Sequence, residues 1–383
     1  ADSMFACVLP LVLSTSPTTQ HHARVWGGGS TLVRHQTSLR RPISTTPHRA
    51  PAGLVLRLRG GALAMKGASK RRRPSNVEGN VFVDESCIDC DTCRWMAPDT
   101  FARDSKSYVH RQPVSDSERQ AALAAMISCP TGSIRLEQPD PLAKQVRQSF
   151  PMAVDSSRIS KVFHLGFHSA ASFGATPYLF GDSSFSCMVD SPRFNSALAN
   201  AIEAAGCVPT FMLLTHIDDV SDHQRWKDRW PSMKRVMHTA DIRGPDAWPY
   251  TDLRGVEMQL DGEGPWELAP GLTAIHTPGH SRGSLCFLAS GERTGGEGVL
   301  FSGDHLAYNA KLGRLDGFAR YGWSLGLQAE SMRKLADLPF TWVLPGHGRR
   351  WMFESDKQRA KTMLQAAEDF AVDPYGRQLV NSP

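Results

Sequence analysis

Histidine and aspartate recur at four places in the second half of the chain, each time close to the end of an apolar run. They are Thr215-His216-Ile217-Asp218-Asp219-Val220-Ser221-Asp222-His223, His276-Thr-Pro-Gly-His280, Ser302-Gly-Asp304-His305 and Leu344-Pro-Gly-His347-Gly. Buried strands that end in such residues bring the side chains together at one sheet edge. Imidazole and carboxylate groups are the ligands of a divalent metal that keeps one position open for water. Two ions ~3.5–4 Å apart could share the Asp304 carboxylate. The pattern predicts a centre with one or two divalent metal ions.

Four of the eight cysteines have the spacing of an iron–sulfur ligand set. Cys87, Cys90 and Cys93 form C-x2-C-x2-C, and Cys129 is followed directly by Pro130. Three thiolates at that pitch converge from one loop on the iron corners of a cluster, and a fourth completes the ligation. We expect one [4Fe–4S] cluster here. A zinc site is the alternative, although zinc motifs usually come as two C-x2-C pairs. A disulfide framework is disfavoured because three cysteines crowd one loop.

These motifs carry two resemblances to known families. The cysteine stretch, residues 80–137, resembles a bacterial-type ferredoxin with a single [4Fe–4S] cluster. The order of motifs over residues 158–375 resembles the metallo-β-lactamase superfamily, which implies an αββα sandwich with the site at the sheet edges. The expected fold class is α+β, with a small ferredoxin-like domain before the sandwich. The combination resembles a group of plant, cyanobacterial and algal plastid fusions, in which Asp-Ser-Pro-Arg recurs, here at residues 190–193.

The first motif departs from the His-x-His-x-Asp-His of most of the superfamily. Asp218 takes the place of the second His, and the Asp-His pair arrives two residues late. The loop must therefore bulge, or the next helix must start earlier. The expected metal ligands are His216, Asp218, Asp222, His223, His280, Asp304 and His347. Asp219 is a further candidate ligand, and Asp218 or Asp219 is alternatively the N-cap of a helix over 219–230. The extra carboxylate leaves zinc, iron and manganese open as the metal.

Two kinds of reaction fit these motifs. The first is hydrolysis of a thioester- or lactone-like acyl bond, in which Asp222, or Asp218 as the second candidate, accepts the proton of a metal-activated water. Three arginines, Arg193, Arg282 and Arg349, are candidate contacts for an anionic small-molecule substrate. The alternative is an iron-dependent oxidoreductase that receives electrons from the ferredoxin domain and hence from an electron-transfer partner. A third hypothesis is that the cluster only senses redox state or docks a partner.

The amino-terminal segment differs from the rest of the chain in charge. Residues 1–75 contain 12 Lys or Arg and one acid, Asp2, so the remainder contains 31 basic and 37 acidic residues. An Arg- and Ser-rich, acid-poor start is typical of a transit peptide. We expect a disordered plastid-type targeting segment over 1–75 that is removed on import into the chloroplast stroma. A basic arm that stays and binds something is the alternative.

The segments between and around the motifs complete the expected organisation. Residues 138–157 are polar and carry two early prolines, which predicts a linker between the two domains. A helix over 115–127, with Glu118 near its start, is expected to pack under the cluster. The mildly acidic remainder of the chain argues against nucleic-acid binding. Because no apolar run reaches about 18 residues, no membrane span is expected.

Overall fold

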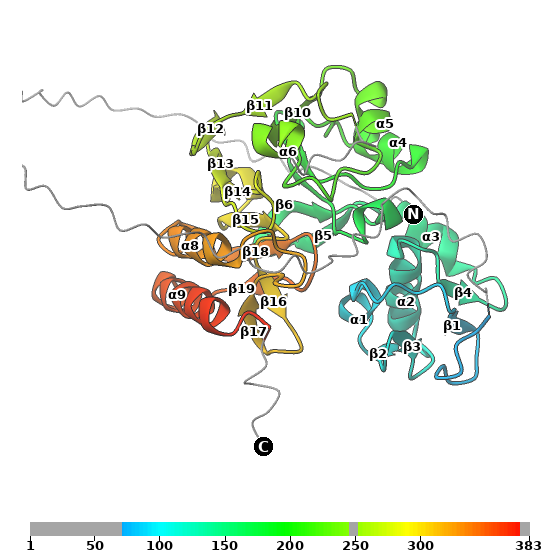
Figure 1. Ribbon diagram of the computed structural model, residues 1–383. Coiled ribbons are helices and arrows are strands. Elements are labelled where there is room, and N and C mark those ends of the chain that lie inside the picture. Colours follow the sequence, from blue (N-terminus) through cyan, green and yellow to red (C-terminus); the bar gives the residue numbers. More distant parts are fainter. Residues whose placement is uncertain (1–70, 245–251, 376–383) are drawn as a thin grey trace, which may run out of the picture. The chain divides into compact units, whose positions relative to one another are not determined.

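The computed structural model describes residues 71–244 and 252–375, which form a small cysteine-bearing domain and a larger sandwich of two β-sheets (Figure 1). The described residues all belong to one compact unit, residues 62–383. This arrangement confirms the expected α+β class. No helix in the described ranges is long and apolar enough to cross a membrane.

The small domain is built around one long helix. Its elements are β1 (Val81–Val83), α1 (Thr92–Met96), β2 (Phe101–Arg103), β3 (Ser107–Val109), α2 (Asp116–Ser128) and β4 (Ile134–Leu136). β1 pairs with β4, and β2 pairs with β3, in both cases antiparallel. α2 begins at a capping box in which Ser115 and Glu118 satisfy each other's backbone N–H groups, which confirms the expected helix start.

The first sheet of the sandwich has seven strands in the order β11-β10-β9-β8-β7-β6-β5. The strands are β5 (Met152–Asp155), β6 (Ile159–His164), β7 (Tyr178–Gly181), β8 (Ser186–Val189), β9 (Phe211–Leu213), β10 (Lys234–His238) and β11 (Met258–Leu260). The helices between them are η1 (Ala170–Ser172), α4 (Ser196–Ala204), α5 (His223–Arg229) and α6 (Thr239–Arg243).

The second sheet has six strands in the order β12-β13-β14-β15-β18-β19. They are β12 (Trp266–Ala269), β13 (Leu272–His276), β14 (Leu285–Ala289), β15 (Val299–Gly303), β18 (Trp342–Pro345) and β19 (Trp351–Met352). The hairpin of β16 (Ala307–Asn309) and β17 (Arg314–Asp316) and the helices α7 (Gly291–Thr294), α8 (Leu325–Leu335) and α9 (Asp356–Val372) complete this half.

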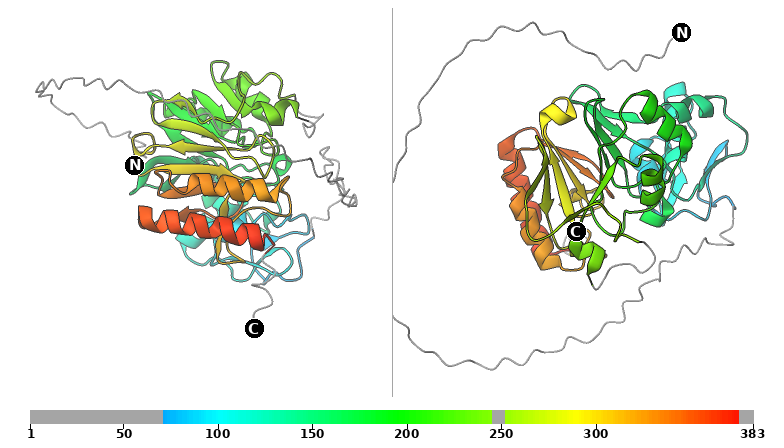
Figure 2. Two further views of the ribbon diagram at one scale, coloured as in Figure 1. Left: turned by 60° about the vertical axis from the view of Figure 1, so that its left-hand side comes forward. Right: turned by 90° about the horizontal axis from the view of Figure 1, so that it is seen from above.

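The two sheets face each other across an apolar core. Phe180 from the first sheet stacks on Phe301 from the second, with ring centroids 5.0 Å apart. α8 and α9 lie against the outer face of the second sheet, and α4 and α5 lie on the outer side of the first (Figure 2). Within this sandwich β9 runs parallel to β8 and β10, and β15 runs parallel to β18. The loops that follow β9, β15 and β18 carry most of the His and Asp motifs.

The expected linker is wrong, because residues 138–157 are largely structured. They form α3 (Leu142–Gln148) and the edge strand β5. The buried side chain of Val146 joins the same apolar cluster as Leu123 and Ile127 of α2 and Phe167 of the sandwich. The small domain and the sandwich therefore share a hydrophobic core, and burial of that apolar surface holds them together.

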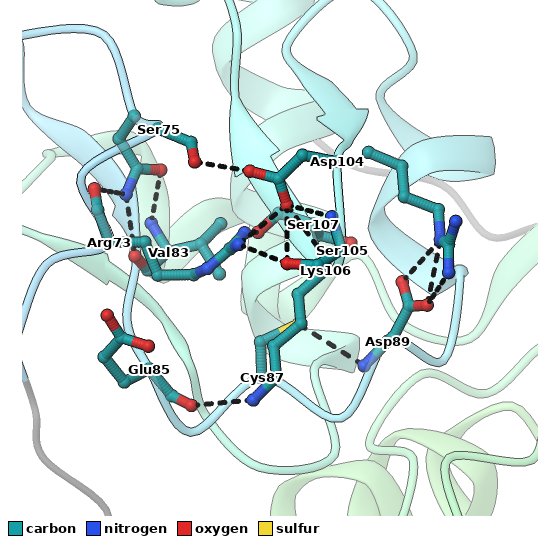
Figure 3. A network of polar contacts seen from close by, with 12 residues as sticks. Arg73, Ser75, Val83, Glu85, Cys87, Asp89, Asp104, Ser105, Lys106 and Ser107 are labelled. Atoms are coloured by element: carbon teal, nitrogen blue, oxygen red, sulfur yellow. Dashed lines mark hydrogen bonds and ion pairs between the residues drawn. The ribbon is translucent and has the colours of Figure 1, made fainter.

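The end of the expected targeting segment is also misplaced. Residues 1–70 lie outside the described residues, so plastid targeting stays a prediction. Residues 71–75 belong to the folded small domain: Arg72 pairs with Asp84 in an isolated β-bridge, and Arg73 is buried. Arg73 donates hydrogen bonds to the Ser107 carbonyl and to Asp104 (Figure 3). The sequence missed this because the five residues share the basic composition of the segment before them.

The buried guanidinium of Arg73 gives the first testable prediction. Arg73→Ala removes a charge-assisted hydrogen bond to a buried carbonyl, so we expect the free energy of unfolding to fall by about 2 kcal/mol. Chemical denaturation followed by circular dichroism measures this. The control is Arg254→Ala, because the Arg254 side chain is 83% exposed. Equal stability of the two variants would contradict the role of Arg73.

Candidate metal centre and iron–sulfur site

Four cysteine side chains surround one cavity in the small domain. Cys87 and Cys90 lie in the loop before α1, Cys93 lies within α1, and Cys129 is the C-cap residue of α2. All four are free thiols and line the same cavity. The rest of the wall combines four apolar residues with four hydroxyl-bearing ones: Val83, Ile88, Ala125 and Ile134, and Thr92, Ser107, Thr131 and Ser133. The four sulfurs are therefore not used in disulfides and converge on one space.

Each of the four sulfurs lies near a hydrogen-bond donor. The pairs are Asp89 N–Cys87 Sγ at 3.5 Å, Thr92 Oγ1–Cys90 Sγ at 3.4 Å, Ser107 Oγ–Cys93 Sγ at 3.2 Å and Ser133 N–Cys129 Sγ at 3.3 Å. Burial raises the pKa of Cys90 to about 11 and also raises the pKa of Cys93. Thiolates are stable in such a cavity only beside a cation, which the iron of a cluster supplies. The residues present therefore fit an iron–sulfur cluster.

Two groups of potential metal ligands in the sandwich share Asp304. The first is His216, His280 and Asp304, and the second is Asp219, Asp304 and His347. Within each group the ligand atoms lie within 4.8 Å of one another. Asp218 stands beside the first group, with Oδ2 3.9 Å from His216 Nε2 and 3.8 Å from His280 Nε2. The shared carboxylate is the arrangement expected for two neighbouring ions.

The strand ends explain why these residues meet. His216, Asp218 and Asp219 lie in the loop after β9, and the adjacent ends of β15 and β18 supply Asp304 and His347. Gly346 precedes His347, and a Cβ atom there would lie 2.9 Å from Asp219 Oδ2 and 3.0 Å from Asp304 Oδ1. A glycine at this position therefore lets the β18 loop approach both carboxylates.

Several buried ligand atoms of the two groups have no hydrogen-bond partner. They are His216 Nε2, His347 Nε2 and both carboxylate oxygens of Asp219. Burying polar atoms without partners is costly, and a carboxylate more so than a neutral group. Metal coordination would satisfy all four atoms, so the donor set fits bound divalent cations.

A hydrogen-bond chain fixes the orientation of His216. The Thr215 hydroxyl donates to the Asp190 carboxylate, with Oγ1 2.9 Å from Oδ1. Because its proton is used there, the hydroxyl oxygen accepts from His216 Nδ1 at 3.0 Å. Nε2 of His216 therefore keeps its lone pair and faces Asp304 Oδ2 at 3.9 Å. Such outer contacts set the tautomer of a metal-binding histidine.

The electrostatics of the centre are those of crowded carboxylates. Burial, together with the charges of Asp304, Asp190 and Asp218, raises the pKa of Asp219 well above its usual value. Burial also raises the pKa of Asp190 to about 7. Burial also tends to raise the pKa of Asp304. His347, which donates a hydrogen bond to Asp304 from Nδ1 at 2.8 Å, outweighs burial and lowers the pKa of Asp304 well below the usual range. Negative charge therefore accumulates here as the pH rises.

This crowding predicts a pH-dependent stability for the metal-free protein. The raised folded-state pKa of Asp190 contributes stability that is fully present below its unfolded pKa of about 4 and is lost as the pH rises through about 7, and the raised pKa of Asp219 acts in the same direction. Buried histidines such as His216, whose pKa burial lowers to about 4, act in the opposite direction. We therefore expect the two aspartates to make the thermal midpoint fall over that interval relative to a protein without them, and added Zn²⁺ to raise it more at neutral than at acidic pH. Differential scanning fluorimetry tests this. In Asp190→Asn the fall should be smaller, and an unchanged profile would contradict the assignment.

Three expected ligands lie outside both groups: Asp218 stands beside the first group, whereas Asp222 and His223 bind other residues. Asp222 accepts a hydrogen bond from the Phe194 backbone N–H at 2.8 Å, and the Nδ1 atom of His223 accepts one from Arg235 at 2.9 Å. The helix does not begin early, because α5 starts at His223 and the residues before it form turns. Asp222, not Asp218 or Asp219, is its N-cap residue, with φ of 53°. Asp219 reaches the second group instead.

The three arginines considered for substrate binding have different surroundings. Arg349 donates from Nε to Asp91 of the small domain at 3.0 Å. Arg282 lies over the ring of Trp323, 4.1 Å from its centroid. The side chain of Arg193 is exposed, and its charge contributes to lowering the pKa of His168. Arg349 is therefore engaged between the two domains, with 35% of its side chain exposed.

Sequence reasoning did not assign a role to Asp190 and Asp241. Asp241 of α6 accepts hydrogen bonds from the backbone of Ile217 at 3.0 Å and Gly283 at 2.7 Å. It therefore joins the loop that carries His216 to the turn that carries His280. Asp190 was noticed only within Asp-Ser-Pro-Arg, and no spacing rule connects Asp241 with either loop.

Comparisons with known proteins agree with this division into two domains. Residues 83–136 match the model of the 4Fe-4S single cluster domain of Ferredoxin I. Residues 197–347 match the model of the metallo-beta-lactamase superfamily. A hydroxyacylglutathione hydrolase of Xanthomonas axonopodis pv. citri (strain 306) is 31% identical over 163 residues, which are 42% of this chain and 55% of that enzyme. The chain thus spans about half the length of this curated relative.

Solved structures are similar to the sandwich at low sequence identity. A metallo-beta-lactamase from Staphylococcus aureus subsp. aureus COL is 20% identical, with a TM-score of 0.41, and the match covers 58% of this chain and 68% of that one. An archaeal metallo-beta-lactamase superfamily protein from Sulfolobus tokodaii is 18% identical, with a TM-score of 0.34, and the match covers 50% of this chain and 79% of that one.

Proposed function

The chain joins a single-cluster ferredoxin domain to a metallo-β-lactamase superfamily domain, and on that premise we propose that it is a metal-dependent hydrolase with a dinuclear centre. The observation that carries the proposal is the position of Asp304, which belongs to both groups of potential ligands. The proposed ligands are His216, Asp218, His280 and Asp304 for one ion and Asp219, Asp304 and His347 for the other. This set is rich in oxygen, which suits iron and manganese as well as zinc.

The reaction that this centre suits is hydrolysis of an activated acyl bond. When bound, divalent ions polarise a carbonyl group and lower the pKa of a coordinated water to about 7. Asp218 is the carboxylate most open to solvent, with 29% of its side chain exposed against 11% for Asp304 and none for Asp219. We therefore assign to Asp218 the acceptance of the proton from the attacking water. Asp222 suits this role less, because it lies outside both groups of potential ligands and its Oδ2 accepts from the Phe194 backbone N–H.

Aromatic side chains beside the centre suit a substrate with an apolar portion. The Phe318 ring lies 6.4 Å from the ring of His280 and 6.3 Å from that of His347. The same loop continues to Tyr321 and Trp323, which are exposed, and the Trp323 backbone N–H donates to the His280 carbonyl. The similarity to a hydroxyacylglutathione hydrolase supports a thioester as the substrate class. A lactone is the neighbouring possibility, since it presents the same activated carbonyl.

A second candidate function is an iron-dependent oxidoreductase fed by the ferredoxin domain. The observation that favours it is the hydrogen bond from Arg349, two residues after His347, to Asp91 beside the cysteine cavity. The loop that carries a proposed metal ligand therefore touches the proposed cluster site.

Anaerobic purification followed by elemental analysis and a thioesterase assay tests the first candidate. We expect four iron atoms per cluster, about two further divalent ions and release of free thiol from a hydroxyacyl-glutathione thioester. The thiol release should stop when a chelator removes the divalent ions and return when they are added back. A protein that holds its metals but cleaves neither thioesters nor lactones would overturn the hydrolase proposal.

A further inference from the structure

Two buried side chains connect the cysteine cavity to the sandwich. Thr92 of α1 is 2% exposed, and His168, in the loop after β6, is fully buried. The Thr92 hydroxyl oxygen lies 3.4 Å from Cys90 Sγ and 3.3 Å from His168 Nδ1. One hydroxyl group therefore lies between a cysteine of the proposed cluster and an imidazole of the other domain.

The direction of these hydrogen bonds follows from the neighbours of His168. Its Nδ1 lies 2.9 Å from the Gly174 carbonyl oxygen, which can only accept, so Nδ1 carries the proton. Its Nε2 then accepts from His164 Nε2 at 2.7 Å. The Nδ1 proton is shared between the Gly174 carbonyl and, at the longer distance of 3.3 Å, the Thr92 hydroxyl oxygen, so the Thr92 hydroxyl directs its own proton to the Cys90 sulfur. The result is a continuous hydrogen-bond chain from Cys90 to the Gly174 carbonyl.

The loop over residues 174–176 continues this chain to the metal centre. Gly174 lies directly against the cluster cysteine, because a Cβ added to it would be 2.9 Å from Cys90 Cβ and 3.3 Å from Cys90 Sγ. Two residues later, the Thr176 backbone N–H donates a hydrogen bond to the Gly346 carbonyl at 2.7 Å, and Gly346 directly precedes His347. Three consecutive residues thus join a contact with Cys90 to a contact with the residue before His347.

We propose that the loop over residues 174–176, with Thr92 and His168, is an electron-transfer route between the iron–sulfur site and the metal centre. In this step the reduced cluster loses one electron, and a trivalent metal ion at the centre gains that electron and becomes divalent. The metal that undergoes this change is iron. An external one-electron donor of low potential, such as dithionite or a reduced iron–sulfur protein, restores the cluster. The inference rests on the metal centre proposed above but not on the hydrolase reaction.

One part of the cysteine cavity wall is exposed where an external electron donor could approach. Ile88 lines the cavity and is 40% exposed. Cys90, by contrast, is in contact with Gly174 of the sandwich. Electrons would therefore enter near Ile88 and leave past Cys90.

Magnetic coupling between the two sites is the first test, and it uses the full-length holoprotein. The reduced cluster is paramagnetic, so a paramagnetic ion close to it accelerates its electron-spin relaxation. We expect faster relaxation with Mn²⁺ at the metal centre than with diamagnetic Zn²⁺, measured by power saturation of the electron paramagnetic resonance signal. Identical saturation with the two ions, at equal metal content, would overturn the route. Absence of bound divalent metal would instead overturn the metal centre itself.

The rate of internal electron transfer is the second test. The metal centre is loaded with a Mössbauer-active iron isotope and oxidised, and the protein is mixed anaerobically with dithionite and freeze-quenched. We expect the ferric signal to disappear at a rate that does not depend on dithionite concentration. In a Cys87→Ala/Cys90→Ala variant the rate should become slow and proportional to dithionite. An equally fast, concentration-independent reduction in that variant would overturn the proposal.

Two matched variants, each lacking one hydroxyl group, distinguish an effect on the transfer route from an effect on the reduction potential of the cluster. Thr92→Val and Ser107→Ala each remove a hydroxyl group next to a cluster cysteine, but only Thr92 contacts His168. Loss of a hydrogen bond to sulfur lowers the cluster potential and so raises the driving force in both variants. We expect internal transfer to be several-fold slower in Thr92→Val than in Ser107→Ala. Equal rates, or a faster rate in Thr92→Val, would contradict the route.

Discussion

Replacing Asp304 by Asn is expected to abolish turnover and to remove most of the divalent metal while the protein stays folded. Asp304 is the one carboxylate that belongs to both ligand groups, so its loss weakens the two ions together. Metal ions contribute several kcal/mol of transition-state stabilisation, which corresponds to a fall in kcat/KM of about 10³-fold or more. Elemental analysis and the thioesterase assay on the same preparation measure both effects.

The four cysteines provide an internal control for Asp304→Asn. The cysteine cavity does not include Asp304, so the iron–sulfur absorbance should be unchanged in the variant. Loss of the cluster signal along with the divalent metal would indicate general unfolding. Full metal content together with full turnover would show that Asp304 does not bridge two ions.

The second large effect is a difference in metal binding and activity between variants of two aspartates, Asp219 and Asp222, that lie three residues apart. Asp219 is fully buried, with both oxygens unpartnered and within the second ligand group, whereas Asp222 bonds the Phe194 backbone. Asp219→Asn should therefore lose about one equivalent of metal and most of the activity. Asp222→Asn keeps the oxygen that accepts from Phe194 and should keep both metal and activity.

A titration with Zn²⁺ or Mn²⁺ by calorimetry distinguishes these variants most directly. Asp219→Asn should show one binding event fewer than the wild-type protein, and Asp222→Asn should match the wild type. The reverse pattern would mean that the loop after β9 carries the superfamily's Asp-His pair in the position that the sequence alone suggested.

The contrast between Asp219 and Asp222 shows that the sequence predicts the ligands at strand ends better than those in the loop over residues 216–223. Asp304 and His347 follow buried strands directly, and a strand end has a definite place in a sandwich, so their convergence was predictable. The loop from 216 to 223 has no such constraint. Its path depends on the positive φ of Asp222 and on the hydrogen bond between Arg235 and His223. Both are tertiary features, and the spacing of the residues does not encode them.

The fold was predictable for similar reasons and with similar exceptions. The αββα sandwich was implied by the resemblance to the metallo-β-lactamase superfamily, and the capping box of α2 follows from local sequence. The polar character and two early prolines of residues 138–157 predict a linker, whereas the structure has α3 and the short edge strand β5 there. An edge strand is paired on one side only, and its pattern is therefore weak. Its role becomes visible only with Val146 buried beside α2.

The loop between β18 and β19 has a consequence for the modularity of this protein. Within four residues it presents His347 to the metal centre, Arg349 to Asp91 and Arg350 to the ring of Trp95, 4.6 Å away. A chimera that exchanges the ferredoxin domain for that of another protein would therefore have to reproduce Asp91 and Trp95 as well as the four cysteines. Without them the graft would leave Arg350 only the more distant ring of Tyr178, 5.5 Å away, and would remove the acceptor of Arg349, which loosens the backbone that carries His347. The position of a metal-centre residue therefore depends on side chains of the other domain.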